Sequence, residues 1–319
     1  MPDTVFDRVR QACAEVAARS RSVAIDEARL DAYVESLADT GARPVLDPAH
    51  HYLGCPAETA GFVVTLDAIN FGSGWWPQLR KLPGLSGYFT IATQLTRRYR
   101  EGGPLTALEL AELGRPEAAD IFGQSSQGPV GELMGHFAHA LNELGRLVLD
   151  RFDGRFDALV LSAEHSAERL LALLTQLPYF RDVAVHGDLE VPLYKRAQLA
   201  SADLALALPD SPLGRFDDLD RLTIFADNLV PHVLRVDGVL RYEPDLAARI
   251  DAARPLEAGA REEVEIRAGG LHAVELLVNR ARGRGRELTA MQADYVLWNR
   301  GQEPAYKAIP RHRARSLYY

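Results

Sequence analysis

The chain has 319 residues, of which 47% are hydrophobic and 25% charged, and its formal net charge is −8 at pH 7. This length allows a large buried core, while the acidic balance speaks against a protein that binds along a nucleic-acid duplex. The two cysteines form no CxxC pair and support neither a zinc knuckle nor a disulfide framework. The first residues lack the apolar segment of a signal peptide, and no long apolar run follows, so we expect a cytoplasmic protein with no membrane partner.

The N-terminal part of the sequence predicts helices. Asp3 can cap a helix that runs to about Ser20, and Asp26 can cap a second helix that runs through Leu37. The short β-branched run at residues 62–66 predicts a strand or a buried extended segment. We expect one domain over residues 1–319, either undivided or built as two helical lobes with the active site between them.

Helices dominate from residue 106 onward, where Thr106 and Glu109 have the spacing of a capping box. The predicted helices are 106–113, 116–122, 131–150, 163–177, 193–208, 244–253, 269–282 and 290–299. Residues 233–240 leave two alternatives, because their Asp-Gly pair is typical of a hairpin turn, whereas apolar spacing over residues 229–234 favours a short helix ending before Gly238. Strands do not alternate with helices, so the sequence predicts a mostly α fold with a small β or extended element.

Two charged positions interrupt apolar surroundings. Asp227 stands alone in the apolar run of residues 222–231, where a carboxylate is costly unless a cation or a ligand meets it. It is the leading catalytic candidate, although capping of the following helix is an alternative. Tyr194, Lys195 and Arg196 open a predicted helix, whose free backbone N–H groups attract anions. They are candidates for a phosphate seat, and a solvated helix end is the alternative.

Residues 66–77 combine aromatic, polar and glycine positions within a dozen residues. Glycines permit close approach of the backbone to a ligand, and aromatic faces stack on planar bases with about 1–3 kcal/mol each. The candidate ligand contacts in this segment are Asp67, Asn70, Phe71, Trp75 and Trp76. A packed turn with buried aromatics is the alternative, and the nearby Tyr88 and Phe89 are more typical of core.

Histidines and basic runs give weaker signals. Glu132, His136 and His139 share one helical face that can hold a metal, but ordinary surface or core positions are favoured, and we expect no metal and no cofactor. His51 lies near the aromatic segment and is a candidate ligand contact. The arginine-rich residues 280–286 are typical of a solvated helix end. The basic, aromatic tail at residues 309–319 either packs back near the active site or is a surface tail.

Taken in order along the chain, these segments resemble the queuosine salvage family, the queuosine 5′-phosphate N-glycosidases. The matching segments are Leu66–Trp76, Tyr179–Asp182, Tyr194–Gln198, Phe225–Asp227, Asp294–Trp298 and the tail from Ile309 to Tyr319. The resemblance implies a fold similar to helix-hairpin-helix DNA glycosylases, in which a lysine precedes an essential aspartate. Lys195 and Asp227 fall in that order, with Asn228-Leu229 where the family often has Tyr-Arg.

The resemblance implies hydrolysis of a C–N ribosyl bond, which releases queuine and ribose 5-phosphate for queuine salvage in tRNA modification. Asp227 then steadies the cationic anomeric centre or the attacking water, and Asp67 orients the base or assists its departure. Lys195, with Tyr194 or Arg196, is expected to hold the phosphate. The full set of substrate-binding residues is His51, Asn70, Phe71, Trp75, Trp76, Tyr194, Lys195, Arg196, Asn228 and Trp298.

Two other classes stay open at this point: a DNA or RNA base glycosylase, and a non-catalytic queuine-binding protein. Release of free base from a nucleotide separates the enzyme from the binding module, and steep salt dependence of binding marks a nucleic-acid enzyme. We expect a monomer that acts on a small-molecule nucleotide without a stable nucleic-acid partner.

Overall fold

The computed structural model describes residues 4–37 and 46–319 and is predominantly helical, which confirms the predicted fold class. Asp3, the predicted first cap, lies outside the described residues. Thr4 caps the first helix, α1 (Val5–Arg19), through a capping box with Asp7. As predicted, the second helix, α2 (Glu27–Leu37), begins directly after Asp26. Across the described residues, no helix combines the length and apolar character needed to cross a bilayer.

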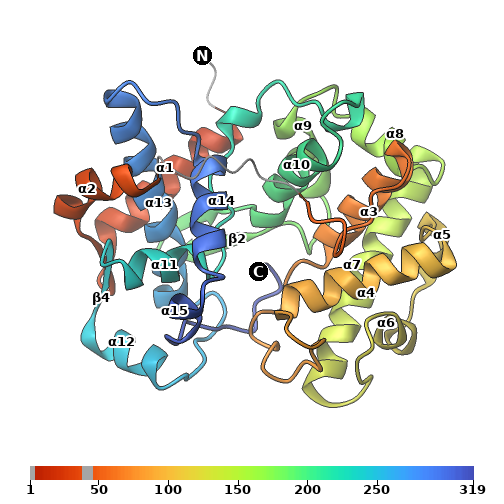
Figure 1. Cartoon of the computed structure of the whole chain (residues 1–319), viewed down its shortest axis with the longest axis horizontal. Helices are drawn as coiled ribbons and strands as arrows, with labels where there is room; N and C mark the ends of the chain where they lie inside the picture. The colour runs from red at the N-terminus through yellow and green to blue at the C-terminus, as the bar shows by residue number, and fades with distance from the viewer. Residues whose placement is uncertain (1–3, 38–45) are drawn as a thin grey trace.

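The chain forms two helical lobes that lie side by side, and the C-terminus lies between them (Figure 1). The first lobe surrounds one hydrophobic core and contains α3 (Pro56–Ala68), α4 (Gly87–Gly102), α5 (Ala107–Glu112), α6 (Arg115–Ile121), α7 (Gly128–Phe152), α8 (Phe156–Leu161), α9 (Ala167–Leu174) and α10 (Lys195–Ala207). The second surrounds another core and contains most of α1, with α2, α11 (Val230–Val236), α12 (Pro244–Asp251), α13 (Arg261–Gly283), α14 (Ala290–Arg300) and α15 (Pro304–Lys307). Tyr194, at the start of α10, packs against both cores.

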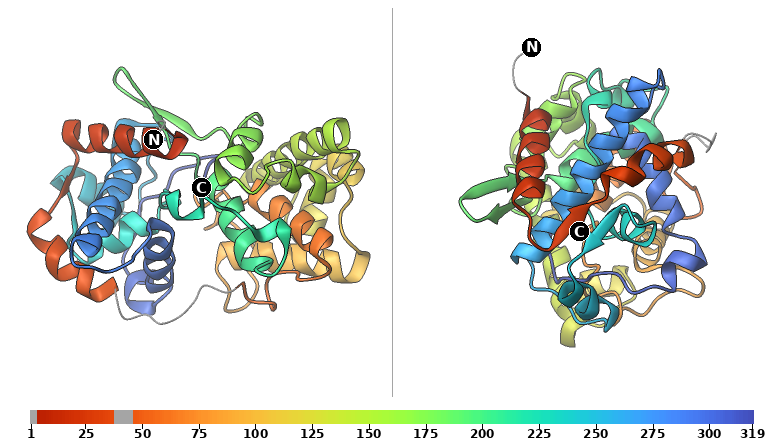
Figure 2. Two further views of the ribbon diagram at one scale, coloured as in Figure 1. Left: turned by 90° about the horizontal axis from the view of Figure 1, so that it is seen from above. Right: turned by 90° about the vertical axis from the view of Figure 1, so that its left-hand side faces the viewer.

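Two short antiparallel sheets join segments of the chain. β1 (Val23–Ile25) pairs with β4 (Leu240–Tyr242), with Ala24 opposite Arg241. β2 (Val183–His186) and β3 (Leu189–Pro192) form a hairpin that projects from the body of the protein (Figure 2). Both sheets are two-stranded, so the β content is small, as the sequence predicts.

The predicted strand at residues 62–66 is wrong, because these residues lie inside α3. Every residue from Thr59 to Ala68 is buried, so the helix has no solvent face and no amphipathic stripe in its sequence. Without that stripe, its β-branched residues resemble a strand. The same helix carries Asp67 into the interior of the protein.

Other helix boundaries differ from the sequence prediction in informative ways. α4 was not predicted as a helix, and α13 begins at Arg261, eight residues before its predicted start at Gly269. The short helix α11 is confirmed, with Gly238 at φ 76° just past its end. The hairpin alternative is wrong, since the strand that follows pairs with β1 instead.

Candidate active site

Five ionisable side chains from four segments come together in the interior of the protein. They are Asp67 of α3, Lys195 and Asp203 of α10, Asp227 in the loop before α11, and Asp294 of α14. We refer to these five residues as the acid–lysine cluster. Because α3 and α10 belong to the first lobe and α11 and α14 to the second, the cluster lies where the two lobes meet.

Asp227 is half-buried and is held by the backbone that follows it. Its Oδ1 accepts hydrogen bonds from the N–H groups of Leu229 (2.7 Å) and Val230 (3.1 Å). The capping role considered from the sequence is therefore present. It occupies one carboxylate oxygen, while Oδ2 accepts no hydrogen bond from a described residue. Asp227 thus combines a fixed orientation with an uncommitted oxygen.

Asp67 is fully buried, and neither of its carboxylate oxygens has a hydrogen-bond partner among the described residues. Burial, together with the nearby Asp203 carboxyl, raises the pKa of Asp67 well above its usual value. Protonation removes the cost of burying the charge. A neutral Asp67 carries an O–H group and can donate a hydrogen bond to a ligand.

Lys195 lies among the carboxyl groups and is buried. Its Nζ donates to the backbone oxygen of Asn70 at 3.1 Å. Burial lowers the pKa of the Lys195 amine, while the charges of Asp227, Asp67 and Asp294 oppose that shift. The amine is therefore the internal counter-ion of the acid–lysine cluster. Acidic surroundings of this kind repel a phosphate dianion, which weakens the phosphate role predicted for Lys195.

The sequence reasoning missed Asp203 and Asp294. Burial raises the pKa of Asp203 to about 7, and the Lys195 amine opposes the shift. Burial and the nearby Asp227 raise the pKa of Asp294 well above its usual value, although its Oδ1 accepts from the N–H of Phe225 at 3.0 Å. In the sequence, each is a single acid on an ordinary helix. The turn spacing from Lys195 to Asp203, two helical turns on α10, is the one signal that could have linked them.

An aromatic wall adjoins the acid–lysine cluster and consists of His51, Tyr88 and Trp298. His51 Nε2 lies 3.0 Å from the hydroxyl of Tyr88, and His51 Nδ1 lies 3.0 Å from the carbonyl of Asp47. Burial lowers the pKa of His51 and favours neutral imidazole. The carbonyl can only accept, so Nδ1 donates to it and Nε2 accepts from Tyr88. The oxygen of Tyr88 then keeps its lone pairs, and the Tyr88 ring meets the Trp298 ring edge-on at 6.1 Å.

A small cavity opens beside this wall. Its lining residues are Leu66, Ile69, Asn70, Phe71, Trp76, Tyr88 and Ile91. The indole Nε1 of Trp76 is buried and has no partner among the residues that the structure describes. An unsatisfied buried donor is costly unless a ligand meets it. The cavity has a volume of about 10 Å³, enough for a single water molecule, so a planar base fits among these aromatic and polar groups only when the side chains that line it move.

Arg196 requires a correction. Its guanidinium is fully buried and donates to backbone carbonyls of Asp67, Ala68, Tyr179 and Leu317, and it lies 4.7 Å from the ring centroid of Phe71. These contacts tie the end of α3 to the C-terminal tail. Backbone carbonyls occupy both terminal nitrogens of Arg196, which supports a structural role in place of the predicted substrate contact.

Two further predicted contacts are occupied by the protein itself. Trp75 is buried, donates from Nε1 to Glu132 at 3.1 Å and has Arg315 over its ring at 5.6 Å. Asn228 donates from Nδ2 to Ser73 Oγ and to the carbonyl of His312, both at 3.1 Å. The structure therefore gives Trp75 and Asn228 packing and positioning roles.

Tyr194 and Phe71 also make contacts within the protein. Tyr194 adopts a left-handed backbone conformation (φ 49°), and the charges acting on its hydroxyl include Arg8 and Glu190, from α1 and β3. Phe71 lines the cavity, but its ring is fully buried and meets Phe137 edge-on at 5.1 Å. The predicted contacts that lie at the cavity or its aromatic wall are Asn70, Phe71, Trp76, Trp298 and His51.

The helical face considered for metal binding is used for other contacts. Glu132 accepts from Trp75 and pairs with Arg315 at 3.2 Å, and His136 Nδ1 lies 3.0 Å from the hydroxyl of Tyr179. Within residues 4–37 and 46–319, no group of three or more acidic, histidine or cysteine side chains has a metal-binding arrangement. The arginine-rich run pairs with acids of α2, for example Arg284 with Asp31 at 2.7 Å.

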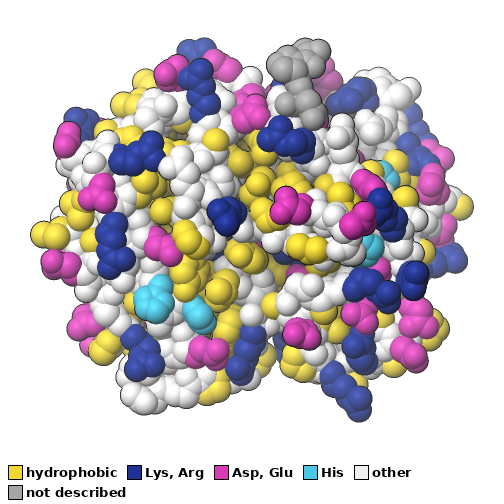
Figure 3. All heavy atoms as spheres, turned by 180° about the vertical axis from the view of Figure 1, so that it is seen from behind, with side chains coloured by type: hydrophobic (Ala, Val, Ile, Leu, Met, Phe, Trp, Pro, Cys, Tyr) yellow, Lys and Arg dark blue, Asp and Glu magenta, His cyan; other side chains and the backbone are white. Residues whose placement is uncertain are grey.

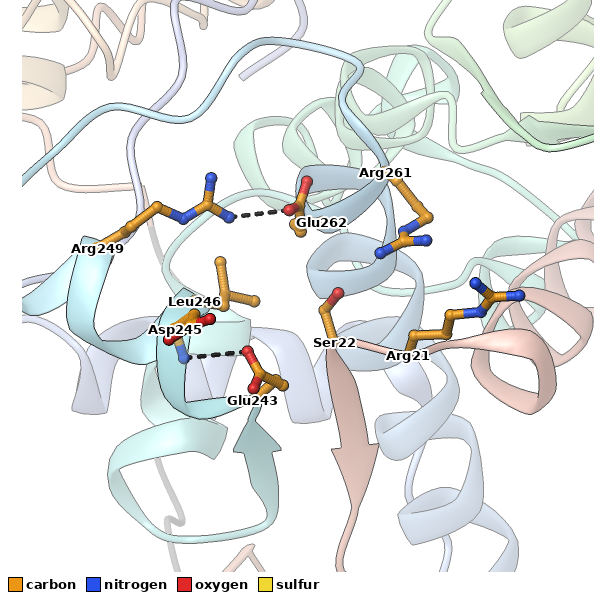
Figure 4. A pocket seen from close by; sticks show the side chains of 8 residues that line it. All are labelled: Arg21, Ser22, Glu243, Asp245, Leu246, Arg249, Arg261 and Glu262. Carbon is orange, nitrogen blue, oxygen red and sulfur yellow. Dashed lines mark hydrogen bonds and ion pairs between the residues drawn. The ribbon is translucent and has the colours of Figure 1, made fainter.

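A larger hollow of about 450 Å³ lies elsewhere, at the edge of the second lobe (Figure 4). Its lining is mostly charged, and its charges meet within the protein, as Arg249 does with Glu262 at 2.9 Å. It contains no aromatic side chain and none of the predicted site residues. The acid–lysine cluster and its cavity are the better candidate for a base-containing ligand.

Sequence comparisons identify the family of the chain. The family model described as queuosine salvage protein matches residues 50–319. A queuosine 5′-phosphate N-glycosylase/hydrolase from Sphaerobacter thermophilus is 38% identical over 313 residues, which cover 95% of each chain. The chain belongs to the queuosine salvage protein family. Relatives of the same name from Mus musculus and Bos taurus are 28% and 29% identical, and each alignment covers 97% of this chain and 98% of the relative.

The queuosine salvage family match includes every residue of the acid–lysine cluster and its aromatic wall, since all of them lie between residues 50 and 319. It also includes the C-terminal tail. The elements α1, β1 and α2 precede the matched range, and they contribute to the core of the second lobe.

Proposed function

We propose that this chain hydrolyses the N-glycosidic bond of queuosine 5′-phosphate and releases queuine and ribose 5-phosphate. The activity for which its relatives are named indicates the substrate. The observation that carries the proposal is the carboxylate of Asp227, oriented by two backbone N–H groups and with its other oxygen free beside the buried acid–lysine cluster.

Asp227 acts at the anomeric carbon. As the bond from C1′ to the base nitrogen breaks, its electron pair leaves with the base and C1′ gains oxocarbenium character. A fixed negative oxygen stabilises that charge strongly where water is excluded. Water then adds its oxygen to C1′, one of its protons is lost through Asp227, and the departing base gains a proton. The sum is one nucleotide and one water converted to one base and one sugar phosphate.

The base lies in the cavity beside Tyr88. Trp76 offers an aromatic face and a free indole N–H, and Asn70 offers an amide for the edge of the base. Burial raises the pKa of Asp67 well above its usual value and favours the protonated carboxyl, whose O–H donates to the base and assists its departure. Trp298 and His51 hold Tyr88 in place.

Queuine carries a secondary amine on its cyclopentenediol arm, and this amine is cationic at neutral pH. Asp203 is the candidate partner for that charge. With a pKa of about 7, its carboxyl is shared between the neutral and ionised forms at neutral pH, and a cationic amine beside it favours the ionised form. The combination of Asp67 and Asp203 thus supports a base that needs both a donor and an anion.

We also propose that the protein acts as a cytoplasmic monomer on the free nucleotide, as a single domain and without a metal or cofactor. The pairing of the arginine-rich run with α2 supports an enzyme that does not track nucleic acid. On the face opposite that of Figure 1, acidic and basic side chains are interspersed (Figure 3). Such a surface offers no continuous basic track for phosphates.

A release assay tests the function. Purified protein is incubated with queuosine 5′-phosphate, queuosine, guanosine monophosphate and queuosine-containing tRNA, and free base is separated by chromatography. We expect queuine from queuosine 5′-phosphate and no guanine. Binding of queuine without any release identifies a binding protein, and release from tRNA alone identifies a nucleic-acid glycosylase; either result overturns the proposal.

A further inference from the structure

The C-terminal tail crosses the space between the lobes beside Asp227. Asn228, the next residue after Asp227, donates to the carbonyl of His312 at 3.1 Å. The N–H of Leu256 donates to the carbonyl of Arg313 at 2.8 Å, and Leu256 forms an isolated parallel bridge with Ala314. The tail backbone is thus fixed to the catalytic loop on one side and to the second lobe on the other.

Alternation along this extended tail separates two kinds of side chain. His312 and Ala314 are buried, whereas Arg311 and Arg313 lie on the opposite side of the backbone and are half-buried. Arg315 continues that side and pairs with Glu132. Arg311 and Arg313 form neither an ion pair nor a side-chain hydrogen bond with any described residue.

A third cation faces these two arginines. Lys81, in the loop before α4, lies close enough that burial and the charges of Arg313 and Arg311 lower the pKa of its amine. The one carboxylate that acts appreciably on Arg311 is that of Asp227. We call Lys81, Arg311 and Arg313 the tail cation cluster. Three like charges that form no ion pair within the described residues repel one another, and a dianion placed among them removes that cost.

We infer that the tail cation cluster binds the 5′-phosphate of the substrate, in place of the Lys195 seat expected from the sequence. The inference rests on the proposed function for the identity of the nucleotide. In a nucleoside 5′-phosphate, only the ribose ring and one methylene separate the phosphate from the glycosidic carbon. A carboxylate at the anomeric centre with cations immediately beside it matches that arrangement. Lys195, surrounded by carboxyl groups, does not.

This site makes the end of the chain a specificity element. The loop 225–228 supplies the catalytic carboxylate, and the tail bound to Asn228 supplies two phosphate ligands, so one hydrogen-bonded unit spans both ends of the ribose phosphate. Arginine suits phosphate because it donates two parallel hydrogen bonds with a fixed charge.

The test compares phosphorylated and unphosphorylated substrates in an Arg311→Gln/Arg313→Gln variant. We expect kcat/KM for queuosine 5′-phosphate to fall by about 100-fold, since two charge-assisted contacts are lost, and kcat/KM for queuosine to fall far less. The exposed Lys307→Gln variant, which removes one cation from the same region of the chain, is the control and keeps wild-type selectivity. Equal losses on both substrates overturn the inference.

Binding of ribose 5-phosphate, followed by thermal shift, separates this inference from the proposed function. We expect the ligand to raise the Tm of the wild type and of Lys307→Gln, and to leave that of the Arg311→Gln/Arg313→Gln variant unchanged. If the wild type releases no queuine but shows this pattern, the function fails and the phosphate site stands. If the double variant responds as the wild type does, the site fails. A Lys81→Ala variant, which removes the third cation and leaves the tail sequence unchanged, repeats the comparison should the double variant not fold.

Discussion

The protein contains two buried groups of charges that differ in how completely the protein satisfies them. In the first, Arg267 donates to both oxygens of Asp182 at 3.1 and 2.6 Å and to the carbonyl of Ala226 at 2.9 Å. Although burial opposes it, Asp182 holds the pKa of this guanidinium above its usual value. In the second, the acid–lysine cluster, both oxygens of Asp67 lack partners among the described residues.

The difference distinguishes structure from chemistry. A buried charge with every donor and acceptor paired maintains the fold, and Arg196 belongs to this class despite its place beside Lys195. A buried acid without partners destabilises the fold and is expected where a ligand completes the site. The comparison also explains why residues adjacent in sequence, such as Lys195 and Arg196, differ in role.

The largest predicted effect on stability is at the satisfied pair. Replacing Arg267 by Met leaves Asp182 buried without its cation, so we expect the free energy of unfolding to fall by about 3–5 kcal/mol. Urea denaturation measures it. Arg261→Met, on the exposed face of the same helix, is the control and should cost less than about 1 kcal/mol. A similarly small loss in Arg267→Met would erase the distinction between the two groups of charges.

The opposite pattern is expected in the acid–lysine cluster. Asp67→Asn removes an unsatisfied acid, so the free energy of unfolding should stay the same or rise, while kcat/KM for queuosine 5′-phosphate falls by about 100-fold. Release of queuine and urea denaturation are measured on the same preparation. Asp150→Asn, an exposed position on α7, controls for the chemical change. A variant that loses stability and keeps its activity would place Asp67 among the structural charges.

The smallest effect is in the pH dependence of stability. The pKa of Asp203 is raised to about 7 in the folded state from an ordinary value of 3.8. The folded protein therefore holds the proton more tightly, and this contribution to stability is complete below the ordinary value and is lost as the pH rises through about 7. We expect the wild type to lose more stability between pH 5 and pH 8 than Asp203→Asn does.

The exposed Asp210, in the turn after α10, provides the matched control. Asp210→Asn should keep the pH dependence of the wild type. If Asp203→Asn follows the same curve as Asp210→Asn in urea denaturation at both pH values, Asp203 does not hold a proton in the folded protein.

Much of the fold prediction depended on residues that lie close together in the sequence. The capping box of Thr106 and Glu109 is present in α5, and Gly238 follows α11 as expected. Both depend on residues a few positions apart. The helix α3 escaped prediction because it is buried on all sides, so its sequence shows no periodicity to distinguish it from a strand.

The site was only partly predictable for a related reason. The isolation of Asp227 in an apolar run is visible in the sequence, and its capping hydrogen bonds follow from its place before a helix. The partners Asp203 and Asp294 become visible only when α10 and α14 are brought together. Hydrogen-bond saturation of Arg196 and Trp75 is equally invisible, since their partners are distant carbonyls and acids.

The central claim is tested most directly by Asp227→Asn. The amide oxygen can still accept from Leu229 and Val230, so the loop should keep its shape, while the negative charge at the anomeric centre is lost. We predict that kcat for queuine release from queuosine 5′-phosphate falls by about 1000-fold, with the Kd for queuine changed by less than about tenfold. Turnover within tenfold of the wild type would contradict the assignment of Asp227 to the reacting carbon.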